Sequence, residues 1–262
     1  MSCNASNESH AIFCAACGVM KFKPALREAG PSVADEPPLP PPLQFQGTVA
    51  GFWMGWVGAT AGGMILGWLL QSALSTGLFQ ILYDSLGEVG SQVASAVLSA
   101  LIYGTLVGFF QGLTLGRRVD DTPWIDWAVS TLAGAFVSNL AYLGMPAQWS
   151  NSQSYQESLL WGSLSGTVGG LSAGLLQARV LTRRFGSARW TLRWTAVSVA
   201  ASLLGNLAGI TLWHSLIFEP RDGMAQYYLA GVVHVLVDGV VTASLAGPLL
   251  GVWLRRTLAG RP

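Results

Sequence analysis

Long apolar stretches separated by short polar segments make up most of the chain. From Leu43 to Gly116 the only charged side chains are those of Asp84 and Glu88. A helix that spans a lipid bilayer needs about 20 mostly apolar residues, and the sequence has six windows of this kind. It therefore predicts six transmembrane helices. They cover residues 49–74, 93–115, 127–143, 159–181, 194–217 and 228–254.

The composition narrows the class of protein. Of the 262 residues, 51% are hydrophobic and only 10% are charged, whereas a soluble domain carries about 25% charged residues. No Gly-X-Y period is present, and three cysteines are too few for a disulfide scaffold. We therefore expect an all-α, polytopic membrane protein whose main partner is the lipid bilayer. A net charge of +1 without a basic domain argues against nucleic acid as a partner.

The positions of lysine and arginine predict how the chain is threaded. With six spans, thirteen of the fourteen basic residues fall on one side and only Arg221 falls on the other. Cationic flanks resist crossing an energised membrane, so the basic side is predicted to be cytoplasmic, together with both termini. Anionic lipid is expected to contact its arginine loops. The basic side holds Lys21, Lys23, Arg27, Arg117, Arg118, Arg179, Arg183, Arg184, Arg189, Arg193, Arg255, Arg256 and Arg261.

Two strings of residues repeat along the chain. Gln111 precedes an arginine pair by six and seven residues, and Gln177 precedes a second arginine pair at the same offsets. Arg255 and Arg256 end the sixth window as the other arginine pairs end the second and fourth. The pattern predicts three tandem hairpins, each with a tryptophan pair, a span, a short outer loop, a second span and an arginine pair. The matched strings are Gln111, Arg117, Arg118, Trp124, Trp127 and Asn139, and Gln177, Arg183, Arg184, Trp190, Trp194 and Asn206; Trp53 and Trp56 open the first window.

Glycines spaced four residues apart mark helix faces that pack closely. Small residues at this spacing let two backbones approach each other in lipid. The same ridges would also suit a glycine-lined conduit or the face of a homo-oligomer. The ridges consist of Gly104, Gly108 and Gly112 on the second window and Gly162, Gly166, Gly170 and Gly174 on the fourth.

Polar residues inside the predicted spans are the candidates for function. Asp238 is the one acid deep within a span, and His234 lies four residues earlier on the same helical face. Such a pair can relay protons, hold a cation or satisfy itself by hydrogen bonding. The spacing resembles the HxxxD element of cation-diffusion-facilitator zinc transporters, whose second acidic pair is missing from this sequence. Interhelical hydrogen bonds are expected from Gln111, Asn139, Gln177 and Asn206.

Residues 1–44 differ in composition from the apolar remainder of the chain. Residues 1–22 hold all three cysteines, residues 23–44 form a Pro-rich linker, and residues 45–262 form the predicted bundle. The stretch resembles a bacterial N-terminal zinc ribbon, C-x-x-C-G-x-x-N-x-x-x-x-x-F-C-x-x-C-G, with Cys3 as the second cysteine of the first knuckle. Three outcomes are open: the missing cysteine lies upstream, His10 completes a Cys₃His zinc site, or the thiols are free. The matching residues are Cys3, Asn7, Phe13, Cys14, Cys17 and Gly18.

The functional prediction is that of an accessory protein. The bundle resembles uncharacterised multi-pass bacterial membrane proteins whose hairpins turn on a glutamine, an arginine pair and a tryptophan pair. This resemblance implies residence in a bacterial inner membrane. No catalytic motif is present, so we expect a scaffold or accessory subunit rather than an enzyme, with a cytoplasmic tail that docks a protein partner or senses a signal. The alternatives are a small-solute, cation or proton transporter that uses Asp238 and His234, and a pigment- or cofactor-binding subunit.

Overall fold

The computed structural model describes residues 44–119, 124–143, 154–186, 188–217 and 224–259. These residues belong to one compact unit, Pro42–Pro262. The expected zinc ribbon at 1–22 and almost all of the Pro-rich linker lie outside the described residues. The helical elements are α1 (Val49–Gly116), α2 (Trp124–Leu143), α4 (Tyr155–Phe185), α5 (Arg189–Ile217) and α6 (Met224–Ala259).

The longest element, α1, consists of two helical arms joined at Gly87. This residue has φ 70° and ψ −177°, a backbone conformation that side-chain-bearing residues rarely adopt. The sequence predicted a loop between the windows 49–74 and 93–115. Instead, the helices continue through this segment and reverse at one glycine. We call residues 49–86 the first arm of α1 and residues 88–116 the second arm.

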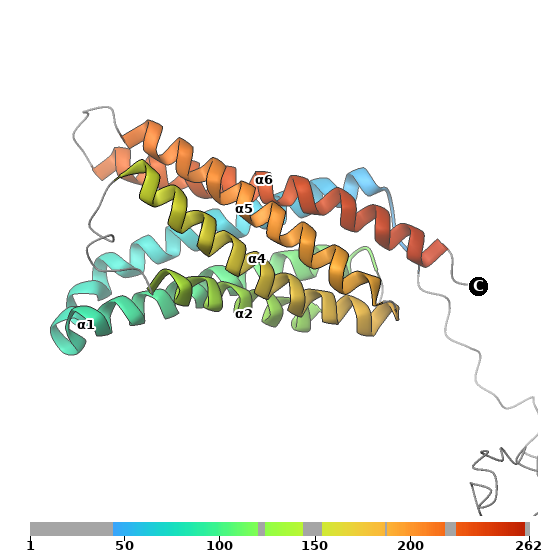
Figure 1. Cartoon of the computed structure of the whole chain (residues 1–262), viewed down its shortest axis with the longest axis horizontal. Coiled ribbons are helices and arrows are strands. Elements are labelled where there is room, and N and C mark those ends of the chain that lie inside the picture. Colours follow the sequence, from blue (N-terminus) through green and yellow to red (C-terminus); the bar gives the residue numbers. More distant parts are fainter. Residues whose placement is uncertain (1–43, 120–123, 144–153, 187, 218–223, 260–262) are drawn as a thin grey trace, which may run out of the picture. The chain divides into compact units, whose positions relative to one another are not determined.

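The helices form a closed ring. Each element packs against the next in the chain, and α6 packs against α1, which closes the ring. Figure 1 shows the helices running roughly along one common direction, with the second arm of α1 and the helix α2 on one side and α5 and α6 on the other; the first arm of α1 begins beside α6.

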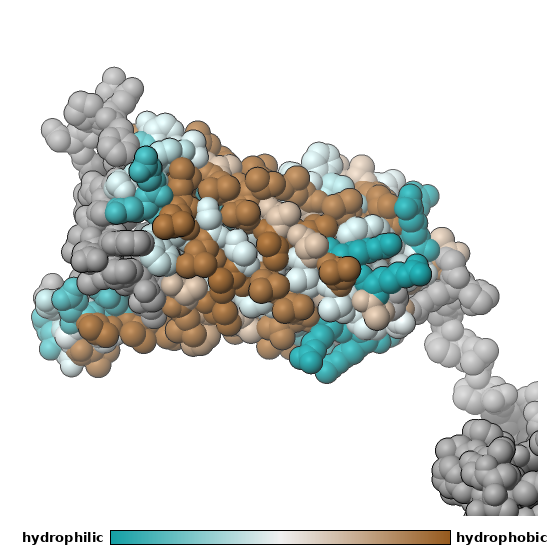
Figure 2. Space-filling view, in the orientation of Figure 1, coloured by the Kyte–Doolittle hydropathy of each residue, from teal (hydrophilic) through white to brown (hydrophobic). Residues whose placement is uncertain are grey.

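Within the described residues, five helical segments are long and apolar enough to cross a membrane. They are Val49–Leu74, Ile81–Gly116, Tyr155–Phe185, Arg189–Leu216 and Tyr228–Ala259. The 20-residue α2 is not among them. The all-α prediction is confirmed, and the fold has the helices of a polytopic membrane protein; a span at α2 stays a prediction. Figure 2 shows an apolar band between two ends that carry hydrophilic side chains.

The distribution of side chains is reversed with respect to a water-soluble protein. Leu70 of α1, Leu171 of α4 and Leu204 of α5 are 49%, 46% and 48% exposed on the outside of the ring. Gln177 and Asp238 are buried, with 5% and 7% of their surface exposed. Lipid tails solvate leucine but not a polar group, so polar residues are expected to face the interior.

Hydrogen bonds and contacts bring the arginine-bearing helix ends together. The backbone N–H of Gln46, just before α1, donates to the carbonyl of Arg118, just after it, over 2.8 Å. The Arg118 guanidinium also donates to the carbonyl of Gln46 over 3.2 Å. At the start of α5, Arg189 shares a pocket with Arg256 near the end of α6. The helix ends that carry the arginine pairs and the tryptophan pairs therefore lie at one end of the ring, which we call the arginine end.

The predicted glycine ridges are buried between neighbouring helices of the same chain. A Cβ added to Gly170 of α4 would lie 2.7 Å from the Ser198 carbonyl oxygen and 2.8 Å from the Val199 Cα of α5. A Cβ on Gly108 would lie 2.8 Å from the Ala128 Cα of α2. These distances are too short for any side chain, so the ridges serve helix packing inside the chain.

This close packing predicts the effect of adding one methyl group. Gly170→Ala should destabilise the protein by about 1–3 kcal/mol, because the Cβ meets backbone atoms that cannot move aside. The matched control is Gly58→Ala, since a Cβ at Gly58 meets nothing within 4 Å. Denaturation of the purified protein in detergent measures both variants. Equal stability of the two would contradict the packing assignment.

Candidate functional site

Three tryptophans from three different helices meet inside the arginine end. Trp56 of α1, Trp127 of α2 and Trp194 of α5 are almost fully buried, with 1%, 0% and 2% of their surfaces exposed. Their ring centroids are 5.6 Å apart for Trp56 and Trp127, 5.7 Å for Trp127 and Trp194, and 6.4 Å for Trp56 and Trp194. Aromatic pairs at these separations attract each other. We call these three residues the tryptophan triad. Their rings fill the interior of the helix ring at the arginine end.

Two glutamines hold the triad in place. The Gln111 side chain accepts a bond from the Trp127 indole N–H over 3.2 Å and donates to the Thr60 hydroxyl over 2.9 Å. Gln111 is on the second arm of α1, so its two hydrogen bonds link this arm to the first arm and to α2. The prediction that Gln111 makes interhelical hydrogen bonds matches this geometry.

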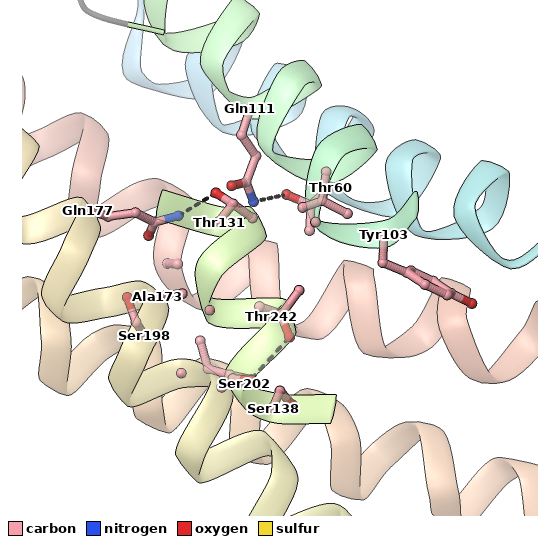
Figure 3. Close-up of a pocket in the computed structure, with 18 of the residues that line it drawn as sticks. Thr60, Tyr103, Gln111, Thr131, Ser138, Ala173, Gln177, Ser198, Ser202 and Thr242 are labelled. Atoms are coloured by element: carbon pink, nitrogen blue, oxygen red, sulfur yellow. Dashed lines mark hydrogen bonds between the residues drawn. The ribbon is translucent and has the colours of Figure 1, made fainter. Parts of the chain in front are cut away.

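The same arrangement recurs one hairpin later. The Gln177 side chain of α4 accepts from the Trp194 indole N–H over 2.9 Å and donates to the Thr131 hydroxyl over 2.8 Å. In both cases the threonine lies four residues after a triad tryptophan. Figure 3 shows both glutamines reaching the threonine of a neighbouring helix.

The third equivalent position holds an alanine instead of a glutamine. Gln111 and Gln177 lie seven residues after Gly104 and Gly170, and the residue seven positions after Gly239 is Ala246. The equivalence rests on contacts, because a Cβ on Gly170 would meet the Val199 Cα, and a Cβ on Gly239 would meet the Ala61 Cα. Val199 and Ala61 each lie five residues after a triad tryptophan. The absence of a third glutamine side chain leaves Ala246 lining a cavity.

That cavity lies in the centre of the ring and has a volume of about 240 Å³. Two members of the tryptophan triad, Trp56 and Trp194, line it together with both glutamines. Hydroxyl groups from α1, α2, α5 and α6 contribute polar surface, and α4 contributes the amide of Gln177. Figure 3 shows several of these side chains around the same space. The polar lining residues are Thr60, Tyr103, Gln111, Thr131, Ser138, Gln177, Ser198, Ser202, Asn206, Asp238 and Thr242.

A second cavity of about 590 Å³ continues toward the opposite end of the ring. It shares five lining residues with the first cavity: Met64, Tyr103, Ser138, Asn206 and Asp238. Its other walls include Gln71 in the middle of the first arm of α1, and Ser158 and His214, which lie near the helix ends farthest from the triad. The two cavities therefore adjoin at these residues. We call them together the central path, which extends from near the end opposite the arginines to the tryptophan triad.

Asp238 lies where the two cavities meet. Its carboxylate accepts a hydrogen bond from the Thr242 hydroxyl one turn later, over 3.1 Å. The absence of a side chain at Gly205 lets α5 approach so closely that an added Cβ would collide with both Asp238 and Thr242. Among the described residues, Asp238 is the only acid that lines either cavity.

His234, one turn before Asp238, lines the outer cavity together with His214 of α5. It packs against the backbone of Gly209, and its Nδ1 forms no hydrogen bond with a described residue. Its ring lies 6.1 Å from that of Trp213. His234 and Asp238, the expected pair, therefore line the same cavity. The Asp238 carboxylate accepts its hydrogen bond from Thr242.

The two predicted asparagines differ from the glutamines. Asn139 donates to the Ala135 carbonyl over 2.9 Å, and Asn206 donates to the Ser202 carbonyl over 3.1 Å. Both bonds stay within one helix, so the expected interhelical bonds are not the ones these side chains make. An asparagine is one methylene shorter than a glutamine, and its amide reaches the carbonyl four residues earlier more easily than a neighbouring helix.

The expected zinc ligands Cys3, His10, Cys14 and Cys17 lie outside the described residues. In the described part of the chain, no group of three or more His, Cys, Asp or Glu side chains is placed to hold a metal ion. The described cavities therefore offer hydroxyl, amide, imidazole and a single carboxylate group to a ligand.

Comparison with protein-family models, with curated proteins and with solved structures finds no match to this chain.

The sequence indicated part of this site and missed the rest. It singled out Asp238, His234 and both glutamines, but it did not predict that Trp56, Trp127 and Trp194 meet. One feature of the sequence could have indicated this contact: each predicted hairpin begins with a tryptophan pair, and the triad consists of the second tryptophan of each pair. Trp53 and Trp124, the first members of two pairs, are 40% and 39% exposed, whereas the second members are buried.

Proposed function

We propose that this protein is a membrane transporter that binds a proton or a small monovalent cation at Asp238 in the central path. The observation that carries the proposal is the position of Asp238, a buried carboxylate in the interior of the helix bundle, where the two cavities of the central path adjoin. A charged group at that depth is costly and typically marks an ion pathway.

The number of charged groups favours a monovalent ligand. One carboxylate surrounded by hydroxyl and amide groups matches one positive charge. Divalent calcium and zinc sites usually combine several carboxylate, imidazole or thiolate ligands, and the described residues contain no such group. The geometry therefore supports the cation and proton alternative better than a zinc transporter.

The tryptophan triad would separate the path from the arginine end. Its three buried rings stand between the central cavity and the arginine-bearing helix ends, so an ion bound at Asp238 would have to pass them to cross completely. Transport then requires a second state in which the triad opens. The recurring glutamine, tryptophan and threonine contacts support the predicted three-hairpin repeat.

Reconstitution of the full chain into liposomes tests the proposal. We expect an imposed gradient of H⁺, Na⁺ or K⁺ to dissipate faster than in protein-free liposomes, as read from pH-sensitive and ion-sensitive dyes. Rates equal to those of protein-free liposomes for all three ions would overturn it.

The remaining sequence predictions stand as part of the proposal. The arginine end would face the cytoplasm of a bacterial cell, and the tail at 1–22 would bind zinc or a protein partner there. A scaffold role rests on that tail, which lies outside the described residues, and a pigment-binding role has no support beyond the aromatic content.

The proposed orientation predicts a labelling pattern. Single cysteines are placed at Arg189 and Arg255, and at Tyr155 near the opposite end, in a chain whose three native cysteines are replaced by serine. In intact cells, an impermeant thiol reagent should label only the cysteine at Tyr155, because cationic segments remain on the cytoplasmic side. Labelling at Arg189 or Arg255 would show that the chain is threaded the other way.

A further inference from the structure

A third cavity lies at the arginine end, between the start of α5 and the end of α6. Its volume is about 190 Å³, and its walls are Arg189, Trp190, Arg193, Trp253, Arg256 and Thr257. It shares no lining residue with the central path. No carboxylate is among its lining residues, so its charge is strongly positive.

The three arginines are arranged to converge on one ligand. Arg189 and Arg193 are four residues apart in α5 and therefore lie on one face of that helix. Arg256 reaches the same cavity from α6. An arginine presents a planar set of N–H donors that matches the oxygens of a phosphate, and the Thr257 hydroxyl adds one more donor.

Two tryptophans form the base of this cavity. The rings of Trp190 and Trp253 are 6.0 Å apart and nearly perpendicular. Trp190 is 4% exposed, and it also contacts Phe185 at the end of α4. Tryptophan is enriched at the headgroup level of membranes, so the aromatic base places this cavity where lipid headgroups lie.

The helix faces below the cavity are apolar. On α6, Leu245 and Leu249 share a face with Trp253 and Arg256, and they are 40% and 42% exposed. On α5, the face of Arg189 and Arg193 continues through exposed alanines at 196 and 200. From the arginine end inward, the surface thus changes from guanidinium to tryptophan to aliphatic side chains, which is the order of groups in a phospholipid.

We propose that the cavity between α5 and α6 binds one anionic phospholipid, with its phosphate on Arg189, Arg193 and Arg256 and its acyl chains along Leu245 and Leu249. The sequence alone placed anionic lipid along the whole basic loop, whereas this site is one defined cavity. The site is independent of the transport proposal.

Lipid binding to the purified full chain in detergent tests the site, with native mass spectrometry as the readout. The protein is titrated with phosphatidylglycerol or with phosphatidylcholine. Wild-type protein should retain phosphatidylglycerol in preference to phosphatidylcholine. The triple variant R189Q/R193Q/R256Q should bind phosphatidylglycerol about 100-fold more weakly, because each cation near a lipid phosphate contributes about fivefold.

The matched control removes three other exposed arginines of the same end, as R117Q/R183Q/R255Q. It loses the same charge but none of the cavity residues, and its affinity should change by less than about threefold. Equal losses in the two triple variants would show that only the overall surface charge matters and would overturn the proposal. Displacement of the lipid by inorganic phosphate at millimolar concentration would assign the cavity to a soluble anion instead. Circular dichroism of both variants establishes that they are folded.

Discussion

Asp238→Asn is expected to abolish ion flux through the reconstituted protein while leaving the fold intact. Asparagine has nearly the same shape as aspartate, and its carbonyl can still accept the hydrogen bond from Thr242. It lacks the negative charge on which the proposed cation or proton would bind. Because burial of an unpaired carboxylate opposes folding, the free energy of unfolding should change by less than about 1 kcal/mol or increase slightly.

The matched control for this prediction is Asp126→Asn. Asp126 is an exposed acid in the first turn of α2, and it lines neither part of the central path. Its replacement removes the same charge and should leave flux unchanged. Flux in liposomes and the melting temperature in detergent are measured for both variants. Undiminished flux in the Asp238→Asn protein would refute the assignment of Asp238.

The second large effect is expected from loss of the Gln177 side chain. Gln177→Leu removes two hydrogen bonds between helices and leaves the buried indole N–H of Trp194 and the hydroxyl of Thr131 without this partner. Side-chain hydrogen bonds between membrane helices contribute about 0.6 kcal/mol on average and up to about 1.7 kcal/mol. The free energy of unfolding of this variant should therefore be about 1–3 kcal/mol lower than that of the wild-type protein, as measured by denaturation in detergent.

Two further variants test whether the loss comes from these bonds. Gln177→Asn should be as unstable as Gln177→Leu, since the shorter amide cannot reach Trp194 and Thr131 together. Gln71→Leu loses a single interhelical bond, accepted from the Ser99 hydroxyl over 2.9 Å, and should lose about half as much stability. If Gln71→Leu and Gln177→Leu were equally destabilised, the tryptophan triad would not depend on its glutamine for stability.

The alanine at the third equivalent position makes the ring asymmetric. Ala246 occupies the position of Gln111 and Gln177, and its hairpin also carries His234 and Asp238. A small side chain at this position leaves space next to Trp56 in the central cavity. The hairpin that lacks the glutamine thus provides the charged group, while the other two hairpins hold the triad.

The prediction of helices long and apolar enough to span a membrane is confirmed for five of the six windows, because it depends on local properties. Apolar length is read within one segment, so five of the six windows correspond to helices that can cross a membrane. The boundaries were less accurate near Gly87, where the polar residues Asp84 and Glu88 indicated a loop but the chain stays helical on both sides of a single glycine. One permissive backbone position, Gly87, allows the chain to reverse there without a longer loop.

The sequence by itself determined that the chain is helical and apolar, that its arginines would lie at one end, and that the glutamines recur at fixed offsets, since each property follows from residue type and spacing along one segment. Only the tertiary structure decided which residues meet: Trp56, Trp127 and Trp194 are 138 residues apart at their extremes and come together because α6 closes the ring on α1. It also decided that Asp238 faces the central path, because the close approach of α5 at Gly205 fixes how α6 is rotated. Spacing along a helix gives a residue its face, and the packing of neighbouring helices determines what that face contacts.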